Sequence, residues 1–249
     1  MSGKGASGTS NPLQVFVRIR PLSAKEVSSI NPKRQRTSIV QYEDSLVFIL
    51  QPDIIKSPEF SSRREKSYAF DHVFPIEASN NEVYSQAIAP LVEGVLDGYN
   101  ATGFAYGMTG AGKTHTMHGD LYGVSNGDKG VCILTMEDMF RRIIAMKERR
   151  EFKIRLSYLE IYNEHVKDLL VEAHEEPSNL MIVEDPNRGV FVPNLSEHVI
   201  STVTDVMNLI IRGNENRTMA PTGANIFSSR SHAILMLNIE QRDKARDVV

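Results

Sequence analysis

The sequence has only one cysteine, Cys132, among 249 residues. An intrachain disulfide and a metal cluster built from several cysteines are therefore excluded, and the composition favours a reducing compartment. No apolar run reaches the roughly 18 residues of a membrane-spanning helix, and no basic segment followed by an apolar one opens the chain. We therefore expect neither membrane insertion nor a secretory signal, and we predict a cytoplasmic protein.

The sequence also has no excess of charge of either sign. Lys and Arg number 28 and Asp and Glu 31, which gives a formal net charge of −3. This balance argues against wholesale binding to nucleic acid. Hydrophobic residues make up 41% and charged residues 24%, as in ordinary globular proteins, so global disorder, coiled coil and collagen-like structure are not expected.

The domain organisation is simple. Residues 1–11 consist mostly of Gly, Ser, Ala and Thr, a composition that buries too little apolar surface to become ordered, so we predict a flexible tail. Residues 12–249 contain neither a repeat nor an internal linker, and their length suits one large α/β domain.

Hydrophobic periodicity predicts alternating strands and helices. Strands are expected over residues 13–20, 46–50, 152–158, 180–183, 190–192 and 233–239, and helices over 79–96, 136–147 and 202–212. Two of the helices begin with the spacing of a capping box, at Ser79 with Glu82 and at Thr202 with Asp205. Pro90 is expected to kink the first helix because proline lacks a backbone N–H.

A phosphate-binding loop is the strongest motif in the chain. Residues 107–114 read GMTGAGKT, match the pattern G-x-x-x-x-G-K-[ST], and follow an uncharged segment, 101–106, that we predict to be a strand buried on both faces. The alternative, an unrelated flexible loop, requires a chance match on the order of one in a hundred. The predicted phosphate-binding residues are Gly107, Met108, Thr109, Gly110, Ala111, Gly112, Lys113 and Thr114.

The chemistry of phosphate binding explains these residue types. Glycines let backbone N–H groups converge on phosphate oxygens. Lys113 is placed to reach the β- and γ-phosphates, and the Thr114 hydroxyl is placed to bind Mg²⁺. The motif does not identify the base or the reaction, because kinases, GTPases, helicases and motors share it.

Two further groups of residues narrow the choice. The guanine-reading pattern N-K-x-D is absent, which argues against a small GTPase. Arg18, Arg20, Pro21 and His115 are suited to form a flat slot for a base by guanidinium and ring stacking. Considered alone, each arginine would be interpreted as a solvent-exposed residue and the histidine as a structural one.

A polar cluster follows the last predicted helix, at residues 225–232, NIFSSRSH. Asn225, Ser228, Ser229 and Arg230 offer an amide, two hydroxyls and a guanidinium, which suit a γ-phosphate, its Mg²⁺ and an attacking water. An ordinary serine-rich loop is the alternative interpretation.

Six segments together closely resemble the kinesin motor domain, in the order of that family. They are RIRP (18–21), YAFDHVF (68–74), GYN (98–100), the phosphate loop followed by HTM (115–117), SYLEIYNE (157–164) and NIFSSRSH (225–232). Myosin, which shares a similar phosphate loop and an N-x-x-S-S-R loop, is disfavoured by the short spacing and by the continuation with serine and histidine.

The resemblance implies an α/β P-loop NTPase fold, a kinesin-like motor head with a central mixed sheet and helices on both faces. It implies ATP and Mg²⁺ as ligands, ATP hydrolysis stimulated by microtubules, and movement along microtubules in the cytoplasm and cytoskeleton. Dimerisation through a coiled coil outside this chain is also expected.

The resemblance also assigns roles to the matching positions. Arg18, Pro21 and His115 would frame adenine. Thr114 and Ser229 would complete the Mg²⁺ site, Asn225 and Ser228 would lie near the γ-phosphate and the hydrolytic water, and Arg230 would pair with a glutamate of the second switch. Arg188, in the turn 185–189, is a candidate contact to the acidic filament, or else an exposed arginine with no partner role.

The second switch of the family, usually D-L-A-G-S-E, does not occur in this sequence. We therefore expect a motor head that is incomplete at its C-terminal side, lacking also the main microtubule-binding helix and the neck. Such a chain is expected to bind ATP weakly or not at all and to hydrolyse it near the background rate. An inactive motor fragment or pseudo-motor that serves as a tether is the alternative function. A nucleotide kinase is a third possibility, although no acceptor site or arginine-rich lid is evident.

Overall fold

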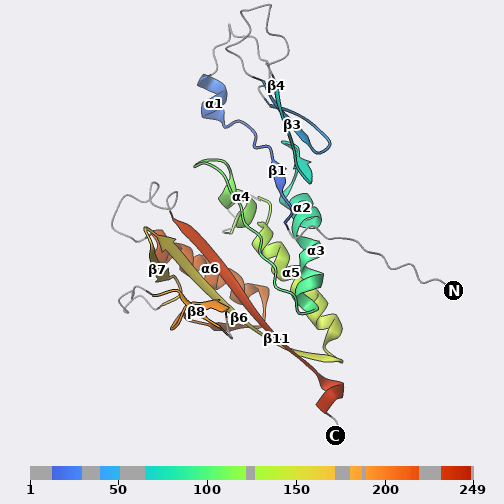
Figure 1. Ribbon diagram of the computed structural model, residues 1–249, viewed down its shortest axis with the longest axis vertical. Helices are drawn as coiled ribbons and strands as arrows, with labels where there is room; N and C mark the ends of the chain where they lie inside the picture. The colour runs from blue at the N-terminus through green and yellow to red at the C-terminus, as the bar shows by residue number, and fades with distance from the viewer. Residues whose placement is uncertain are drawn as a thin grey trace, which may run out of the picture. The chain divides into compact units, whose positions relative to one another are not determined.

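The computed structural model describes residues 13–29, 40–50, 65–121, 127–171, 180–186, 189–218 and 231–247. The chain forms two compact units, Met1–Val83 and Tyr84–Val249 (Figure 1). Within the described ranges, no helix has the length and apolar character needed to cross a membrane.

The described residues of the first unit form two small sheets. Strand β1 (Phe16–Arg18) pairs in parallel with β5 (His72–Phe74), and the Phe16 and Phe74 rings stack with their centroids 6.0 Å apart. The other sheet is antiparallel and has the order β2 (Val40–Glu43), β3 (Leu46–Leu50), β4 (Glu65–Ala69). The described residues of this unit also form two short helices, α1 (Ala24–Ser29) and α2 (Asn80–Val83).

The predicted strands of this unit are confirmed. The bounds 46–50 are those of β3, whereas β1 is shorter than the predicted 13–20 because only three of its residues pair with β5.

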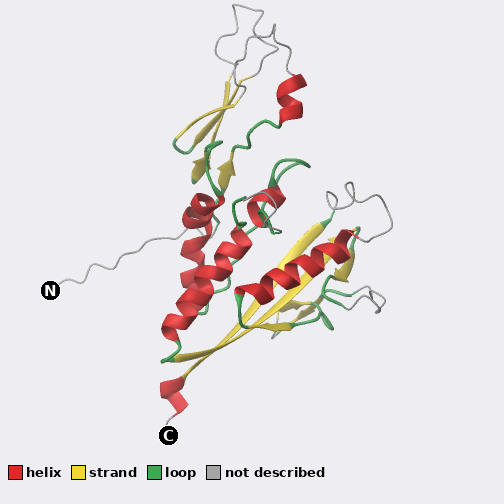
Figure 2. Cartoon of the chain, turned by 180° about the vertical axis from the view of Figure 1, so that it is seen from behind, coloured by secondary structure: helices red, strands yellow, loops and turns green. Residues whose placement is uncertain are grey.

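The second unit holds the longer elements. Its helices are η3 (Tyr84–Ile88), α3 (Ala89–Leu96), α4 (Lys113–Met117), α5 (Val131–Met146), α6 (Val203–Thr218) and η4 (Lys244–Asp247). Its strands are β6 (Arg150–Tyr162), β7 (His165–Asp168), β8 (Val183–Asp185), β9 (Gly189–Phe191), β10 (His198–Ile200) and β11 (His232–Asp243). Strands β10, β6 and β11 form an antiparallel sheet in that order, β7 also pairs with β6, and β8 pairs with β9. Helix α6 lies along the long strands β6 and β11 (Figure 2).

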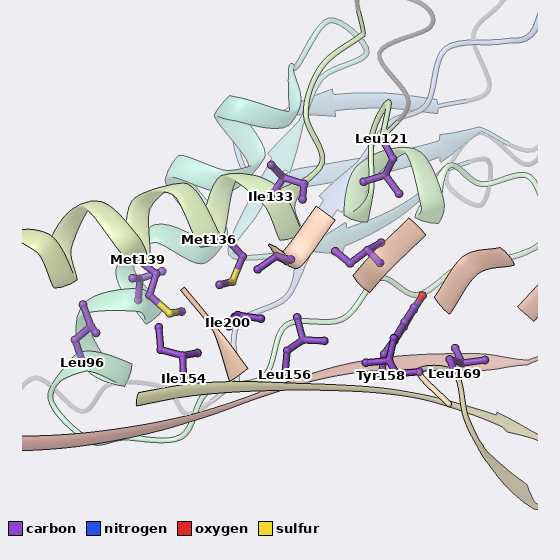
Figure 3. Packing of buried hydrophobic residues seen from close by; sticks show 14 residues of the cluster. Leu96, Leu121, Ile133, Met136, Met139, Ile154, Leu156, Tyr158, Leu169 and Ile200 are labelled. Carbon is purple, nitrogen blue, oxygen red and sulfur yellow. The ribbon is translucent and has the colours of Figure 1, made fainter. Parts of the chain in front are cut away.

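The main core lies between this sheet and its helices. Strand β11 pairs with β6 from His232↔Ile161 to Asp243↔Arg150 without interruption. Because side chains alternate along a strand, Ile154, Leu156 and Tyr158 project from one face of β6 (Figure 3). They pack with Met136 and Met139 of α5 and with residues of α3 and α6. The predicted strands 152–158 and 233–239 are thus confirmed, and both extend further because the ladder continues on each side.

The predicted helix 79–96 forms in three pieces. Its capping box is confirmed, since the Glu82 amide donates to Ser79 Oγ at 3.3 Å and the Ser79 amide donates to Glu82 Oε2 at 2.7 Å. A π-helical turn, η3, comes directly before α3, which carries Pro90 in its first turn. Proline has no N–H to donate to the preceding turn, so the regular helix is interrupted where the sequence predicts a kink.

The capping box of α6 is also confirmed. The Asp205 amide donates to Thr202 Oγ1 at 3.1 Å, and the Thr202 amide donates to Asp205 Oδ2 at 2.8 Å. The helix continues to Thr218, six residues beyond the predicted end, because Asn214 and Arg217 in its last turns bind neighbouring elements.

One predicted strand is wrong. Residues 101–106 form no strand, and the side chains of Phe104 and Tyr106 are 74% and 95% exposed rather than buried on both faces. A strand needs a neighbour to receive its backbone hydrogen bonds, and none of the described strands pairs with this segment.

Candidate functional site

The phosphate loop, residues 107–114, lies in the second unit and ends in helix α4. Gly110 and Gly112 adopt φ values of 81° and 96°, a left-handed conformation that a residue with a Cβ adopts only at a cost. Alternation of left- and right-handed residues bends a backbone into a concave shape with its N–H groups on the inside. The two glycines are therefore required by the conformation of the loop.

The Lys113 side chain folds back onto the same loop. Its Nζ donates to the carbonyl oxygen of Gly107 at 2.8 Å and to that of Met108 at 3.0 Å. The ammonium is thus held at the start of the loop, although Lys113 itself lies at the first position of α4. This arrangement concentrates positive charge where the loop amides lie.

The donor set matches a triphosphate with its metal ion. The loop supplies backbone N–H groups and an ammonium for phosphate oxygens, and Thr114 supplies an exposed hydroxyl. Aromatic and apolar side chains do not fill this part of the loop, since a Cβ added at Gly110 would meet no atom within 4 Å. The residues present therefore fit nucleotide phosphates.

Helix α4 is tied to the core at its C-terminal end. Its C-cap residue, His118, has Nδ1 3.4 Å from Asn214 Nδ2 of α6. Asn214 Oδ1 in turn accepts a hydrogen bond from the Tyr158 hydroxyl at 3.0 Å. Burial, with a further contribution from the positive charge of Arg217, lowers the pKa of His118, so the ring is neutral at physiological pH. The phosphate loop thus rests on a helix that the sheet and α6 hold.

The proposed base slot is divided between the two units. His115 lies exposed on α4 of the second unit, whereas Arg18, Arg20 and Pro21 lie in the first. Arg18 donates from Nη1 to Asn80 Oδ1 at 2.5 Å and from Nη2 to the carbonyl of Ala78 at 2.8 Å. These bonds fix its guanidinium between β1 and α2.

Arg20 has a different partner within the first unit. Its Nη2 lies 2.6 Å from Glu26 Oε1, and this hydrogen bond lowers the pKa of Glu26 to about 2. Arg20 is therefore engaged by a surface carboxylate on α1.

The remaining predicted site residues lie outside the described part of the chain. These are Asn225, Ser228, Ser229 and Arg230 of the polar cluster, and Arg188 of the turn between β8 and β9. Their proposed roles stay predictions.

The structure also reveals a buried ion pair that the sequence analysis missed. Glu160 on β6 is 3% exposed, and its Oε1 accepts a hydrogen bond from Arg217 Nε at 2.9 Å. Arg217 also donates from Nη2 to Ser231 Oγ at 2.8 Å. The detectable signal was Glu160 itself, because a carboxylate within an apolar strand requires a cationic partner.

Comparison with known proteins agrees with this architecture. The kinesin motor domain family matches residues 18–248. Kinesin-like protein 6 of Schizosaccharomyces pombe is 48% identical over 185 residues, which are 73% of this chain and 23% of that protein. Kinesin-like protein KIF18B of Homo sapiens is 37% identical over 245 residues, 93% of this chain and 27% of that protein.

A solved structure of a fast kinesin has a TM-score of 0.78 and 33% sequence identity, covering 94% of this chain and 61% of the other. The fold is therefore the P-loop NTPase fold of a kinesin motor head, as predicted, and its described residues form both parallel and antiparallel strand pairs together with helices. The chain spans about a quarter of the length of these two curated relatives. The family match covers nearly the whole chain, and we conclude that it belongs to the kinesin motor domain family.

Proposed function

We propose that this chain is the nucleotide-binding part of an ATP-driven microtubule motor that hydrolyses MgATP to ADP and inorganic phosphate. The observation that carries the proposal is the phosphate loop, with left-handed Gly110 and Gly112 and with the Lys113 ammonium bound to loop carbonyls. Membership of the kinesin family favours ATP over other nucleotides.

Binding of the triphosphate depends on the loop and its lysine. Backbone N–H groups of the loop would donate to phosphate oxygens. The Lys113 ammonium would turn from the carbonyls of Gly107 and Met108 toward the β- and γ-phosphates. Arg18, Pro21 and His115 are proposed to frame adenine by stacking. Binding would be favoured because an ammonium and several amides replace water around a multiply charged anion.

The proposed reaction is in-line attack of water on the γ-phosphorus, with the bond to the β,γ-bridging oxygen breaking. Asn225 and Ser228 are proposed to lie near the γ-phosphate and the attacking water, and Arg230 is proposed to pair with a glutamate of the second switch. Thr114 and Ser229 would hold Mg²⁺, which when bound neutralises charge on the β- and γ-phosphates. Catalysis in this class rests on positioning and electrostatic stabilisation rather than on a covalent intermediate.

Microtubules are the proposed macromolecular partner, because the chain belongs to the kinesin family. Arg188 remains a candidate contact, and reversing its charge to glutamate in a complete motor is expected to weaken microtubule binding in a salt-dependent way. Dimerisation stays a prediction.

Steady-state ATP turnover tests the proposed function. Phosphate release should be measured for this chain within a complete kinesin head at increasing microtubule concentration, with GTP as a comparison nucleotide. We expect turnover that rises with microtubules and is faster with ATP. Turnover that microtubules do not change, or transfer of phosphate to a nucleotide acceptor instead of water, would overturn the proposal.

The 249-residue chain alone is expected to perform poorly in that assay. The segment 101–106 leads directly into the phosphate loop and has no strand partner among the described residues, so little fixes the entry of the loop. We expect weak ATP binding and hydrolysis near background. Turnover equal to that of an intact kinesin head would contradict this expectation.

A further inference from the structure

The end of α6 contacts the residue that precedes β11, and neither lies in the phosphate loop. Arg217 lies in the last turn of α6, and Ser231 directly precedes β11. Between them in the chain come the residues proposed to lie near the attacking water and to hold Mg²⁺. The described residues on the two sides of this segment are therefore joined through one side chain, that of Arg217.

The Arg217 guanidinium binds both Glu160 and Ser231. Its Nε donates to Glu160 Oε1 at 2.9 Å, and its Nη2 donates to Ser231 Oγ at 2.8 Å and to the Ser231 carbonyl at 3.2 Å. The Arg217 side chain is 16% exposed and that of Glu160 3%, so solvent screens these interactions little.

Glu160 is in turn fixed by the sheet. It lies on β6 opposite Ala233 of β11 on one side and Lys167 of β7 on the other. A residue paired on both sides has little freedom to move, and the carboxylate therefore offers the guanidinium a rigid anchor.

A buried ion pair generally adds little net stability to a fold. Apolar side chains of similar volume often serve as well or better, because the charges lose their hydration. What a guanidinium adds is direction, since its donors lie in one plane at fixed angles. Here Nε is directed at Glu160 on β6 and Nη2 at Ser231.

The same helix face also reaches the phosphate-loop helix. Asn214 lies one turn before Arg217, and it contacts His118 at the end of α4 and the Tyr158 hydroxyl. One turn of α6 thus holds both the base of α4 and the start of β11.

We propose that Arg217, anchored by Glu160, is a positioning residue for ATP hydrolysis that acts by fixing Ser231. Ser229 is two residues from Ser231, so their Cα atoms lie at most about 7 Å apart. Fixing Ser231 therefore restricts where the proposed Mg²⁺ ligand and its neighbours Ser228 and Arg230 lie. The inference rests on the proposed function and assigns new residues to it.

The inference is tested with variants of this chain in a complete motor head. For each variant, the change in kcat is compared with the change in nucleotide affinity. Arg217→Lys keeps the charge but loses the planar fork, and we expect microtubule-stimulated kcat to fall about tenfold or more. The Kd for a non-hydrolysable ATP analogue should change less than about threefold, because the phosphate loop is untouched. Glu240→Gln is the matched control, since Glu240 pairs with Arg155 across the same two strands but is exposed. It should leave kcat unchanged.

Two variants at Ser231 leave the buried pair of Glu160 and Arg217 intact. They test the inference even if Arg217→Lys fails to fold. Ser231→Ala removes one acceptor and should lower kcat about fivefold at an unchanged melting temperature. Ser231→Thr retains the hydroxyl and should restore most of the rate. Equal kcat in the wild type, Arg217→Lys and Ser231→Ala would overturn the inference, as would a loss of affinity parallel to the loss of kcat. Absence of ATP turnover in the wild type would instead count against the proposed function.

Discussion

Two regions of the second unit are built in opposite ways. Strands β6 and β11 pair continuously over the whole length of β11, and α6 contacts β6 on the side of the core. The segment 101–106 and the phosphate loop that follows it have no strand pairing among the described residues, and the aromatic side chains of Phe104 and Tyr106 are exposed. The contrast separates two roles: the sheet packs the core, and the loop carries the glycines and the lysine that are proposed to bind phosphate.

The largest expected effect is a loss of stability on the sheet side. Tyr158 is 1% exposed, and its ring lies so close to Gly213 that even an added Cβ would meet it. Tyr158→Ala is expected to lower the free energy of unfolding by about 3–5 kcal/mol through the cavity it creates. Denaturant titration of the 249-residue chain measures this change.

Phe104→Ala is the matched variant on the loop side. Its ring is exposed, so the change should stay within about 0.5 kcal/mol. Equal losses for the two variants would show that the contrast between the regions is wrong.

Replacing a left-handed glycine of the phosphate loop is expected to lower stability less than Tyr158→Ala does. Gly112→Ala places a Cβ at φ 96° and is expected to cost about 1–2 kcal/mol. Nucleotide binding should fall together with it, because the loop must rearrange. A fluorescent ATP analogue and denaturant titration measure the two effects.

Gly94→Ala provides the control within a regular helix. Gly94 lies in α3, where an added Cβ meets no atom within 4 Å. Alanine favours helix over glycine by about 0.5–1 kcal/mol, so stability should rise slightly. If Gly112→Ala and Gly94→Ala change the free energy of unfolding in the same direction, the left-handed conformation is not the reason for glycine at position 112.

The smallest effect concerns pH and the packing of η3 against α5. Asp138 on α5 accepts hydrogen bonds from the Tyr84 hydroxyl at 2.7 Å and from Arg142 Nε at 2.9 Å. Burial raises the pKa of Asp138, but these bonds outweigh burial and leave the pKa below its ordinary value. A lowered carboxyl pKa contributes stability at pH values above the unfolded pKa, near 4, and this contribution is lost as the pH falls through the folded pKa.

Asp138→Asn should therefore flatten the decline of stability between about pH 5 and pH 2. Melting temperatures across that range, with the exposed Asp97→Asn as a control, measure the difference. A decline of equal slope in the wild type and Asp138→Asn would contradict the assignment.

The sequence predicted the elements whose signals are local. Ser79 with Glu82 and Thr202 with Asp205 cap helices as expected, because a capping box lies within four residues. Alternation along 233–239 identified β11, since one face of that strand packs in the core.

Features that depend on distant residues were less accessible. The uncharged run 101–106 has the composition of a buried strand, but composition does not say whether a neighbour is present to pair with it. Glu160 and Arg217 are 57 residues apart, and only the fold brings them together. The phosphate-loop motif could be recognised because its pattern is contained in eight consecutive residues, and phosphate binding by these residues stays a prediction.

The most direct test of the whole account is the turnover of Lys113→Ala in the complete protein with microtubules present. Lys147→Ala, which removes an exposed lysine after α5, is the control. We expect Lys113→Ala to lose at least about a hundredfold in ATP turnover and Lys147→Ala to retain the wild-type rate. Wild-type turnover in Lys113→Ala would contradict the claim that this loop and its ammonium hold the triphosphate.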